Sequence, residues 1–271
     1  MRILFVGDVI GRPGRRAFKQ LVPGLRDDHH VDVCIVNGEN AAGGRGISAK
    51  CSRELLTAGA DLITLGNHAF DTKEVYGFID DDNRFIRPYN LPPGNPGFGQ
   101  ATFAHREGPL VVAQMCGRVF MQPLDCPFRA ADKLIEQHKD TSPKRIIIDF
   151  HAEATSEKMA FAHYVSGRVA AVIGTHTHVP TADERIFPGG TAYVTDVGMT
   201  GPYHSVIGMA LEPSLKRLMQ LHPTRTDVGS GDVRLAAVLI DIDPETGSAV
   251  AIKRLLLPIP SDKTVDYLIS R

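Results

Sequence analysis

The sequence has no excess of charge of either sign, because 30 Lys and Arg residues stand against 31 Asp and Glu residues. A formal net charge of −1 gives no support for a surface that coats nucleic acid or an anionic membrane. No apolar stretch approaches the roughly 18 residues that a membrane-spanning helix needs. The N-terminal apolar run ends at Asp8, which is too early for a signal peptide. We therefore expect no membrane partner and no strong nucleic-acid surface.

Cysteine is scarce, and no two of the 4 cysteines have C-x-x-C spacing. The absence of this spacing argues against a thiol-redox motif and against a zinc ribbon. Cys34 lies in an apolar run, where a cysteine is usually a small buried residue. Cysteines without a disulfide framework are typical of a reducing compartment, so we expect a cytoplasmic protein.

Short apolar runs rich in β-branched residues recur along the chain. They cover residues 3–7, 32–38, 61–67, 145–151 and 169–176. Continuous apolarity predicts strands that are covered on both faces. Helix-like segments lie between the runs, at 12–25, 48–59, 71–79 and 155–167. This alternation predicts an α/β fold, and the 271 residues, 43% of them hydrophobic, are enough for a single domain over residues 1–271.

Local signals mark the ends of these helices. Ser48 is a candidate N-cap, and Gly59 is a candidate stop for the same helix. Asp71 is a candidate cap for the next helix, with Glu74 three residues later.

The C-terminal part of the chain is different, because residues 235–259 read as two strands joined by a turn. A second β-rich segment lies at residues 108–122, so we expect two sheets with helices outside them. The apolar C-terminal hairpin would form either a core strand or an interface in a homo-oligomer. Residues 87–100 are rich in Pro and Gly and are expected to form an ordered surface loop.

Polar side chains follow five of the apolar runs, at the point where each run ends. They are Asp8; Glu39 and Asn40; Asn67 and His68; His151; and His176 and His178. In an α/β sheet the carboxyl ends of the strands share one edge, where ligands bind. Each residue alone has an ordinary explanation, since Asp8 could cap a helix and Asn67 could hold a turn. Together, at five strand ends, they predict one functional site.

The donor types point to metal chemistry. Carboxylate, amide and imidazole ligands suit Fe, Mn or Zn better than Ca or Mg. The candidates are too many for one ion, and Glu39 is the carboxylate that we expect to bridge two ions. His176 and His178 would then lie in a loop so that each can serve a different ion, with Thr175 and Thr177 securing that loop. Two ions about 3.5–4 Å apart are typical of hydrolytic phosphoryl chemistry, in which they generate a hydroxide at neutral pH.

The same residues resemble the metallophosphoesterase signature: GD, an acidic bridge, GNH, a lone His and here "GTHTH". The closer resemblance is to the YmdB-type family of 2′,3′-cyclic-nucleotide 2′-phosphodiesterases. It rests on "GDVIGRPGR", "NGENAAGG", "DFHAEATSEK", "GTHTHVPTADERI" and "TDVGMTGPY", and it covers essentially the whole chain. The resemblance implies a four-layer α/β/β/α sandwich and a dinuclear centre of iron, with Mn and Zn as alternatives.

By matching positions, the resemblance also implies the ligands of each ion. One ion would take Asp8, Glu39, Asn40 and His178. The other would take Glu39, Asn67, His151 and His176, while His68 would be the proton donor. Two departures from the wider superfamily are Ile10, where that superfamily has a histidine ligand, and Glu39, where it usually has Asp. Both departures agree with the narrower family.

The implied activity is hydrolysis of 2′,3′-cyclic nucleotides to 3′-nucleotides by a metal-activated hydroxide, with a small phosphodiester as the binding partner. The same constellation would serve a phosphomonoesterase or nucleotidase of broad specificity. A different class is a regulatory protein that uses its metals only for stability. His68, which has no ligand role, argues against that class. The Gly-rich segments 43–46 and 198–205 would either border the substrate pocket or form ordinary turns.

Overall fold

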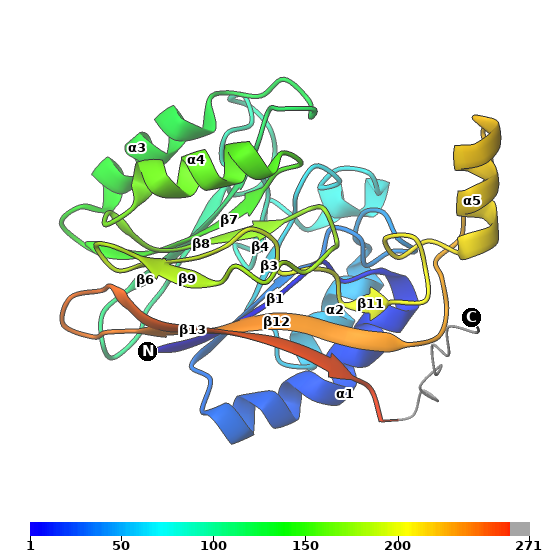
Figure 1. Ribbon diagram of the computed structural model, residues 1–271. Coiled ribbons are helices and arrows are strands. Elements are labelled where there is room, and N and C mark those ends of the chain that lie inside the picture. Colours follow the sequence, from blue (N-terminus) through cyan, green and yellow to red (C-terminus); the bar gives the residue numbers. More distant parts are fainter. Residues whose placement is uncertain (261–271) are drawn as a thin grey trace.

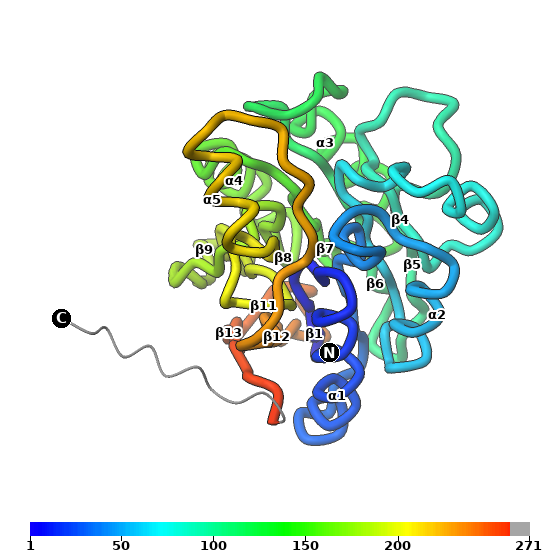
Figure 2. Tube along the Cα trace, turned by 90° about the vertical axis from the view of Figure 1, so that its right-hand side faces the viewer, coloured from blue at the N-terminus to red at the C-terminus, as the bar shows by residue number. Residues whose placement is uncertain are grey.

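Two β-sheets pack face to face, with helices on both outer faces, in the computed structural model, which describes residues 1–260 (Figure 1). Helices α1 (Gly11–His29) and α2 (Ala49–Thr57) cover the first sheet. Helices α3 (Pro127–His138) and α4 (Thr155–Val165) cover the second sheet. Figure 2 shows the two helix pairs on opposite sides of the molecule. The predicted four-layer α/β/β/α sandwich is therefore confirmed.

The first sheet has seven strands and contains both ends of the described chain. Its strand order is β11 (Gly201–Pro202), β12 (Val233–Ile242), β1 (Arg2–Val6), β2 (Val33–Asn37), β3 (Leu62–Thr64) and β4 (Phe85–Ile86), and β13 (Ala249–Pro258) also pairs with β12. Strands β1 to β4 run parallel, so their carboxyl ends lie at the same edge. The hairpin of β12 and β13 confirms the prediction for the C-terminal part.

The second sheet has six strands. Their order is β5 (Gln100–Phe103), β6 (Leu110–Cys116), β7 (Lys144–His151), β8 (Val169–Thr175), β10 (Thr191–Val194) and β9 (Arg185–Phe187). The four central strands are parallel, and an antiparallel strand closes each side. The carboxyl ends of β7 and β8 therefore also lie at one edge.

Three apolar layers hold the sandwich together. One lies between the first sheet and its helices and includes Phe18 and Leu55. A second lies between the sheets, where Phe5 and Ile147 belong to the same cluster. The third lies between the second sheet and α4, where the rings of Phe150 and Phe161 stack 4.1 Å apart. Because the middle layer draws on both sheets, we infer that they belong to one domain.

Helix caps confirm one sequence prediction and correct another. The Ser48 side chain accepts a hydrogen bond from the Cys51 backbone N–H at 3.2 Å, as an N-cap does. Asp71 was expected to cap the next helix, and that expectation was wrong. The short 3₁₀ helix η1 (Lys73–Gly77) begins after Thr72, and the Asp71 carboxylate contacts His68 instead.

Helices α3 and α5 (Leu211–Gln220) were not expected from the sequence. In α5 only Ser214 is buried, and the helix stands apart from the four layers (Figure 1). No helix among residues 1–260 is long and apolar enough to cross a membrane.

Candidate metal centre

The five strand ends singled out in the sequence come together in space, and they come from both sheets. The ends of β1, β2 and β3 bring residues of the first sheet, and the ends of β7 and β8 bring residues of the second. The sequence argument relied on a single shared edge, whereas the structure builds the site from two edges that meet. A carboxylate on β7 links them, because Asp149 accepts hydrogen bonds from Asn37 of β2 at 3.3 Å and from Thr175 of β8 at 2.6 Å.

One group of donors surrounds the Nε2 atom of His151. This nitrogen lies 3.0 Å from Oε1 of Glu39 and 2.8 Å from Oδ1 of Asn67. The Nδ1 atom of His176 lies 3.0 Å away as well. One imidazole nitrogen carries at most one proton, so hydrogen bonding cannot satisfy all these contacts at once. A cation between the four atoms would satisfy them, and Glu39, His151 and His176 form a possible metal site.

A second group adjoins the first through Glu39. The Nδ2 atom of Asn40 lies 3.2 Å from Oε1 of Glu39 and 3.2 Å from Nε2 of His178. A half-turn of the Asn40 amide would present its oxygen here in place of its nitrogen. Oδ1 of Asp8 lies 3.8 Å from Nε2 of His178.

Oδ1 of Asp8 and Nε2 of His178 are both suited to bind a cation. Oδ1 of Asp8 is buried and has no hydrogen-bond partner among residues 1–260, which is costly for a carboxylate. Nδ1 of His178 lies 2.8 Å from the carbonyl of Ile207, to which it can donate its proton. That tautomer leaves Nε2 unprotonated, as a metal-binding histidine requires. The donor set therefore fits a bound cation at this second group also.

The loop after β8 turns two alternate residues towards the same centre. His176 and His178 have φ angles of 99° and 67°, a left-handed conformation that is uncommon for residues other than glycine. The threonine between them, Thr177, donates its hydroxyl to Asp196 at 2.8 Å. Thr175 is likewise held by Asp149, so both threonines secure the loop as predicted. Such side-chain contacts are what keeps a strained loop conformation in place.

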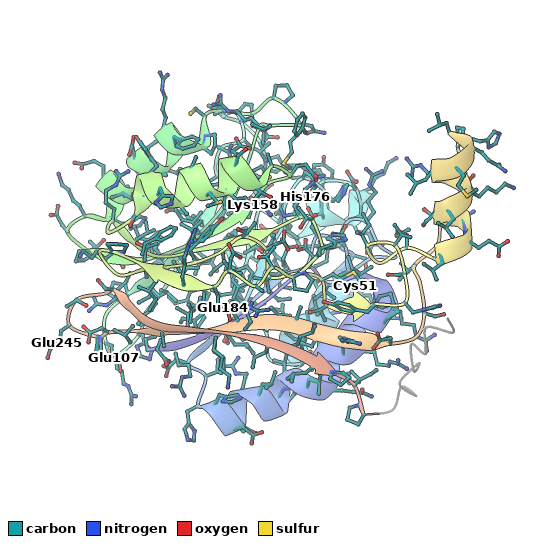
Figure 3. The ribbon with its side chains drawn as sticks, viewed as in Figure 1. Cys51, Glu107, Lys158, His176, Glu184 and Glu245 are labelled. Atoms are coloured by element: carbon teal, nitrogen blue, oxygen red, sulfur yellow. The ribbon has the colours of Figure 1, made fainter. Side chains whose placement is uncertain are left out.

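A buried ion pair that the sequence analysis missed supports this loop. Nζ of Lys158 lies 2.7 Å from Oδ2 of Asp196 and 2.7 Å from the backbone oxygen of Thr175. Figure 3 shows Lys158 and His176 at the same end of the second sheet. The signal in the sequence is the position of Lys158 on α4, where it shares a helical face with the buried Phe161 and Ala162.

Burial and charge shift the pKa values of the central residues strongly. Burial alone would raise the pKa of Glu39, but the charge and hydrogen bond of His151 lower it to about 2. Burial alone would lower the pKa of His151, but Glu39, with Asp8 and Asp149, raises it to about 9. Burial and the nearby His151 lower the pKa of His176 to about 3. These shifts keep the Glu39 carboxylate charged and favour a proton on His151.

His68 lies beside the donors. Its backbone N–H donates to Oε2 of Glu39 at 2.9 Å, and its Nδ1 lies 2.8 Å from Oδ2 of Asp71. The other ring nitrogen, Nε2, is 3.4 Å from Nδ2 of Asn67, at the border of the centre. Arg45 also reaches this ring, with Nε 3.2 Å from Nδ1 of His68, so the Gly-rich segment 43–46 borders the site. Asp71, which fixes the ring, follows His68 by three residues across a turn.

Comparisons with known proteins identify the family to which the chain belongs. The sequence model of the YmdB-like protein family matches residues 4–255. The 2′,3′-cyclic-nucleotide 2′-phosphodiesterase of Bacillus subtilis is 51% identical over 258 residues, which cover 95% of this chain and 97% of that protein.

Solved structures show the same fold. A hypothetical protein from Thermus thermophilus superposes with a TM-score of 0.90 at 46% identity, covering 96% of this chain and 100% of that one. A phosphatase from Mycoplasma pneumoniae has a TM-score of 0.90 at 34% identity, covering 95% and 93% of the two chains. The NAD nucleotidase of Haemophilus influenzae, at 10% identity and a TM-score of 0.60, shares the fold over 95% of this chain and 56% of its own.

These relatives and the site confirm an enzyme of the phosphoesterase type with a metallophosphoesterase fold. Four of the five motifs that indicated this family lie at strand ends that meet in the centre, and the fifth, "TDVGMTGPY", follows β10. By its sequence over residues 4–255, the chain belongs to the YmdB-like family.

Proposed function

We propose that this protein is a dinuclear metal-dependent phosphodiesterase that hydrolyses 2′,3′-cyclic nucleotides to 3′-nucleotides. The observation that carries the proposal is the pair of donor groups that share Glu39, with His68 beside them. The proposed ligands are Asp8, Glu39, Asn40 and His178 for one ion, and Glu39, Asn67, His151 and His176 for the other. Iron is the first choice of metal because the resemblance to the YmdB-type family implies it, and the nitrogen and oxygen donors would also suit Mn or Zn.

When bound, two such ions would supply a nucleophile from water at neutral pH and offset charge on the phosphoryl group. The chain itself holds the donors in position. Oε1 of Glu39 faces His151 at 3.0 Å, while Oε2 is held at 2.9 Å by the backbone of His68. Both carboxylate oxygens are therefore fixed before any ligand arrives, which lowers the reorganisation that binding requires.

His68 is the residue that we assign to the leaving group. When the bond between phosphorus and the 2′-oxygen breaks, that oxygen needs a proton, and the phosphate remains on the 3′-oxygen. Nε2 of His68 lies on the ring edge opposite Asp71 and at the border of the donor groups. Asp71 holds the ring so that this nitrogen keeps its direction, as the partner of a general acid does.

The relative from Bacillus subtilis, which is 51% identical, supports a diester as the substrate. The test compares a 2′,3′-cyclic nucleotide with a 3′-nucleotide and a simple monoester on the same purified protein. We expect the cyclic diester to be hydrolysed and the 3′-nucleotide to accumulate as the end product. Hydrolysis of monoesters without hydrolysis of the cyclic diester would instead assign a phosphomonoesterase or nucleotidase.

We also propose that the enzyme works in the cytoplasm. All four cysteines are free, and three of them are buried. Free cysteines are typical of proteins in a reducing compartment.

A further inference from the structure

A cavity of about 790 Å³ lies outside the metal centre, between the Pro- and Gly-rich segment 87–100 and the face of α3. Five of its lining residues matter here and define what we call the basic cavity. They are Arg87, Tyr89, Phe98, Arg129 and Lys133. The volume lies within the range of roughly 300–1,000 Å³ that is usual for small-molecule sites.

Arg87 carries a charge without a counter-ion. Its guanidinium donates to three backbone carbonyls, those of Pro88 at 2.8 Å, Pro96 at 3.3 Å and Asn95 at 3.4 Å. These acceptors are neutral, and within residues 1–260 no carboxylate forms an ion pair with Arg87. Burial lowers the pKa of this guanidinium. A half-buried cation is costly unless an anion pairs with it, so the arrangement favours an anionic ligand.

Helix α3 adds two more cations to the same cavity. Arg129 and Lys133 are four residues apart, so they project from one face of the helix. Both are exposed, and neither pairs with a carboxylate in the described part of the chain. Two positive charges at this spacing repel each other, a cost that a shared anion between them would remove. The cavity is lined by three cationic side chains and by one acidic side chain, that of Asp125, so the lining has an excess of positive charge.

The cavity also offers aromatic rings. Phe98 lines the cavity, and its side chain is 41% exposed. Tyr89 donates its hydroxyl to Gln137 of α3 at 3.3 Å. That bond fixes the Tyr89 ring on the wall. Exposed aromatic rings beside cations are the combination that binds nucleobases and phosphates together, because every base can stack on a ring. A bare inorganic anion would use only the cations.

The basic cavity lies close to the metal centre but is separate from it. Leu91 lines this cavity and also a second, smaller cavity of about 60 Å³. The smaller cavity is lined by Gly66 and Asn67, so it reaches a proposed metal ligand. Asn90 fixes the segment between them by donating to the carbonyls of Cys116 and Asp125, each at 2.9 Å.

We propose that the basic cavity is a second binding site, which takes the phosphate and base of a nucleotide through its cations and its aromatic rings. This chemistry is shared by a free mononucleotide and by one nucleotide of an oligoribonucleotide. The proposal does not depend on which ester the metal centre hydrolyses.

The test measures binding of 3′-AMP to the metal-loaded protein by calorimetry, with Arg129→Glu/Lys133→Glu as the main variant. We expect two sites per chain in the wild type, one at the metal centre and one in the basic cavity. The variant should bind about tenfold more weakly at one site only, as the loss of two exposed charge contacts predicts. Hydrolysis of a small chromogenic diester at saturation should not change.

The matched control is Lys216→Glu/Arg217→Glu, which makes the same change in net charge on α5, away from α3 (Figure 1). This control should bind 3′-AMP like the wild type. Equal weakening in both double variants would show a general charge effect and would overturn the proposal, as would unchanged binding in the α3 variant.

Phe98→Ala separates a nucleotide from a bare anion. The variant lacks the stacking ring, so 3′-AMP should bind about tenfold more weakly while inorganic phosphate binds as before. Unchanged binding of 3′-AMP would overturn the nucleotide assignment.

A short oligoribonucleotide distinguishes the two sources of the ligand. Binding that is tighter than that of 3′-AMP, and weakened by Arg129→Glu/Lys133→Glu, identifies an oligonucleotide; binding no tighter than that of 3′-AMP identifies the free mononucleotide.

Discussion

At the scale of single residues, His68 stands apart from the other polar groups of the centre because its ring contacts Asp71 and Arg45 as well as its neighbour Asn67. A residue in that position can serve the reaction without holding a metal. The fixed ring and the strand-end position support a role as general acid for the leaving oxygen.

His68→Ala should therefore keep its metal content and lose activity according to the leaving group. We expect a loss of about 10²- to 10⁴-fold on a 2′,3′-cyclic nucleotide, whose alkoxide must be protonated. A nitrophenyl diester should lose much less, because nitrophenolate departs without a proton. Steady-state rates on the two substrates decide the matter, and equal losses on both would contradict the acid role.

Asn40 is the residue on which the first proposed ion most depends. Ile10 is buried and cannot bind a metal, so we propose that the amide of Asn40 takes the place of the ligand that the wider superfamily has there. Asn40→Ala should lower the metal content from about two ions per chain towards about one, with loss of the two-ion chemistry. Excess metal should restore part of the rate. Asn95→Ala, outside the centre, is the control; wild-type metal affinity in Asn40→Ala would remove Asn40 from the ligand set.

His151 links metal binding to pH. In the metal-free centre its pKa is raised to about 9, so between pH 7 and 9 the ring carries a proton that a metal must displace. Displacement of one proton makes the apparent metal affinity fall about tenfold for each pH unit below 9. Titrations of chelator-treated protein at pH 7, 8 and 9 would measure this slope. An affinity that does not change over this range would show that His151 is not a ligand.

The sequence was informative about donors and much less so about their partners. Strand-end polar residues stand out against apolar runs, which is why Asp8 and His178 could be proposed as donors from the sequence alone. The sequence predicts Asp71 as a helix cap because Glu74 follows it by three residues, as in a capping box. The same position in the chain also lets Asp71 contact the ring of His68, and the sequence does not separate the two roles. Only the fold shows that its carboxylate lies 2.8 Å from His68.

At the scale of elements, the loop after β8 depends on the buried pair of Lys158 and Asp196. The pair joins α4 to the segment after β10 and holds the loop that carries His176 and His178. Both side chains are almost completely buried, so neither can find a partner in water if the other is removed.

Lys158→Met keeps the length of the side chain but leaves Asp196 as an unpaired buried charge. We expect about 3–5 kcal/mol of lost stability together with weaker metal binding. Urea unfolding of Lys158→Met, Asp196→Asn and the double variant would test the coupling. The double variant should lose clearly less than the sum of the two single losses; a strictly additive result would mean that the pair does not hold the loop.

Strands with unbroken apolar runs were predictable, whereas helix α3 was missed although Ala131 and Leu134 are buried, and α5 was missed as well. The strands β1, β2, β7 and β8 follow unbroken apolar runs, so the sequence located them within about two residues, as expected of such boundaries. In α5 the apolar residues Leu218 and Met219 are exposed, so no contact with a core set them apart from a polar loop. The helix predicted at residues 71–79 forms only the short 3₁₀ helix η1.

At the scale of the whole molecule, the sandwich packs two mixed sheets together so that the carboxyl ends of their parallel strands meet at one end. Each sheet alone would supply only part of the proposed donors: Asp8, Glu39, Asn40 and Asn67 from the first, and His151, His176 and His178 from the second. The apolar layer that both sheets share is thus what sets the spacing of the centre. The sequence could predict two sheets, but their relative placement depends on packing between residues far apart in the chain.

The most direct test of this account is a metal titration of chelator-treated protein during hydrolysis of a 2′,3′-cyclic nucleotide. The rate should remain near zero without metal and should level off at about two equivalents per chain, as a two-ion mechanism requires. The product should be the 3′-nucleotide. Full activity without added metal, or a rate that saturates at one equivalent, would contradict the dinuclear centre shared through Glu39.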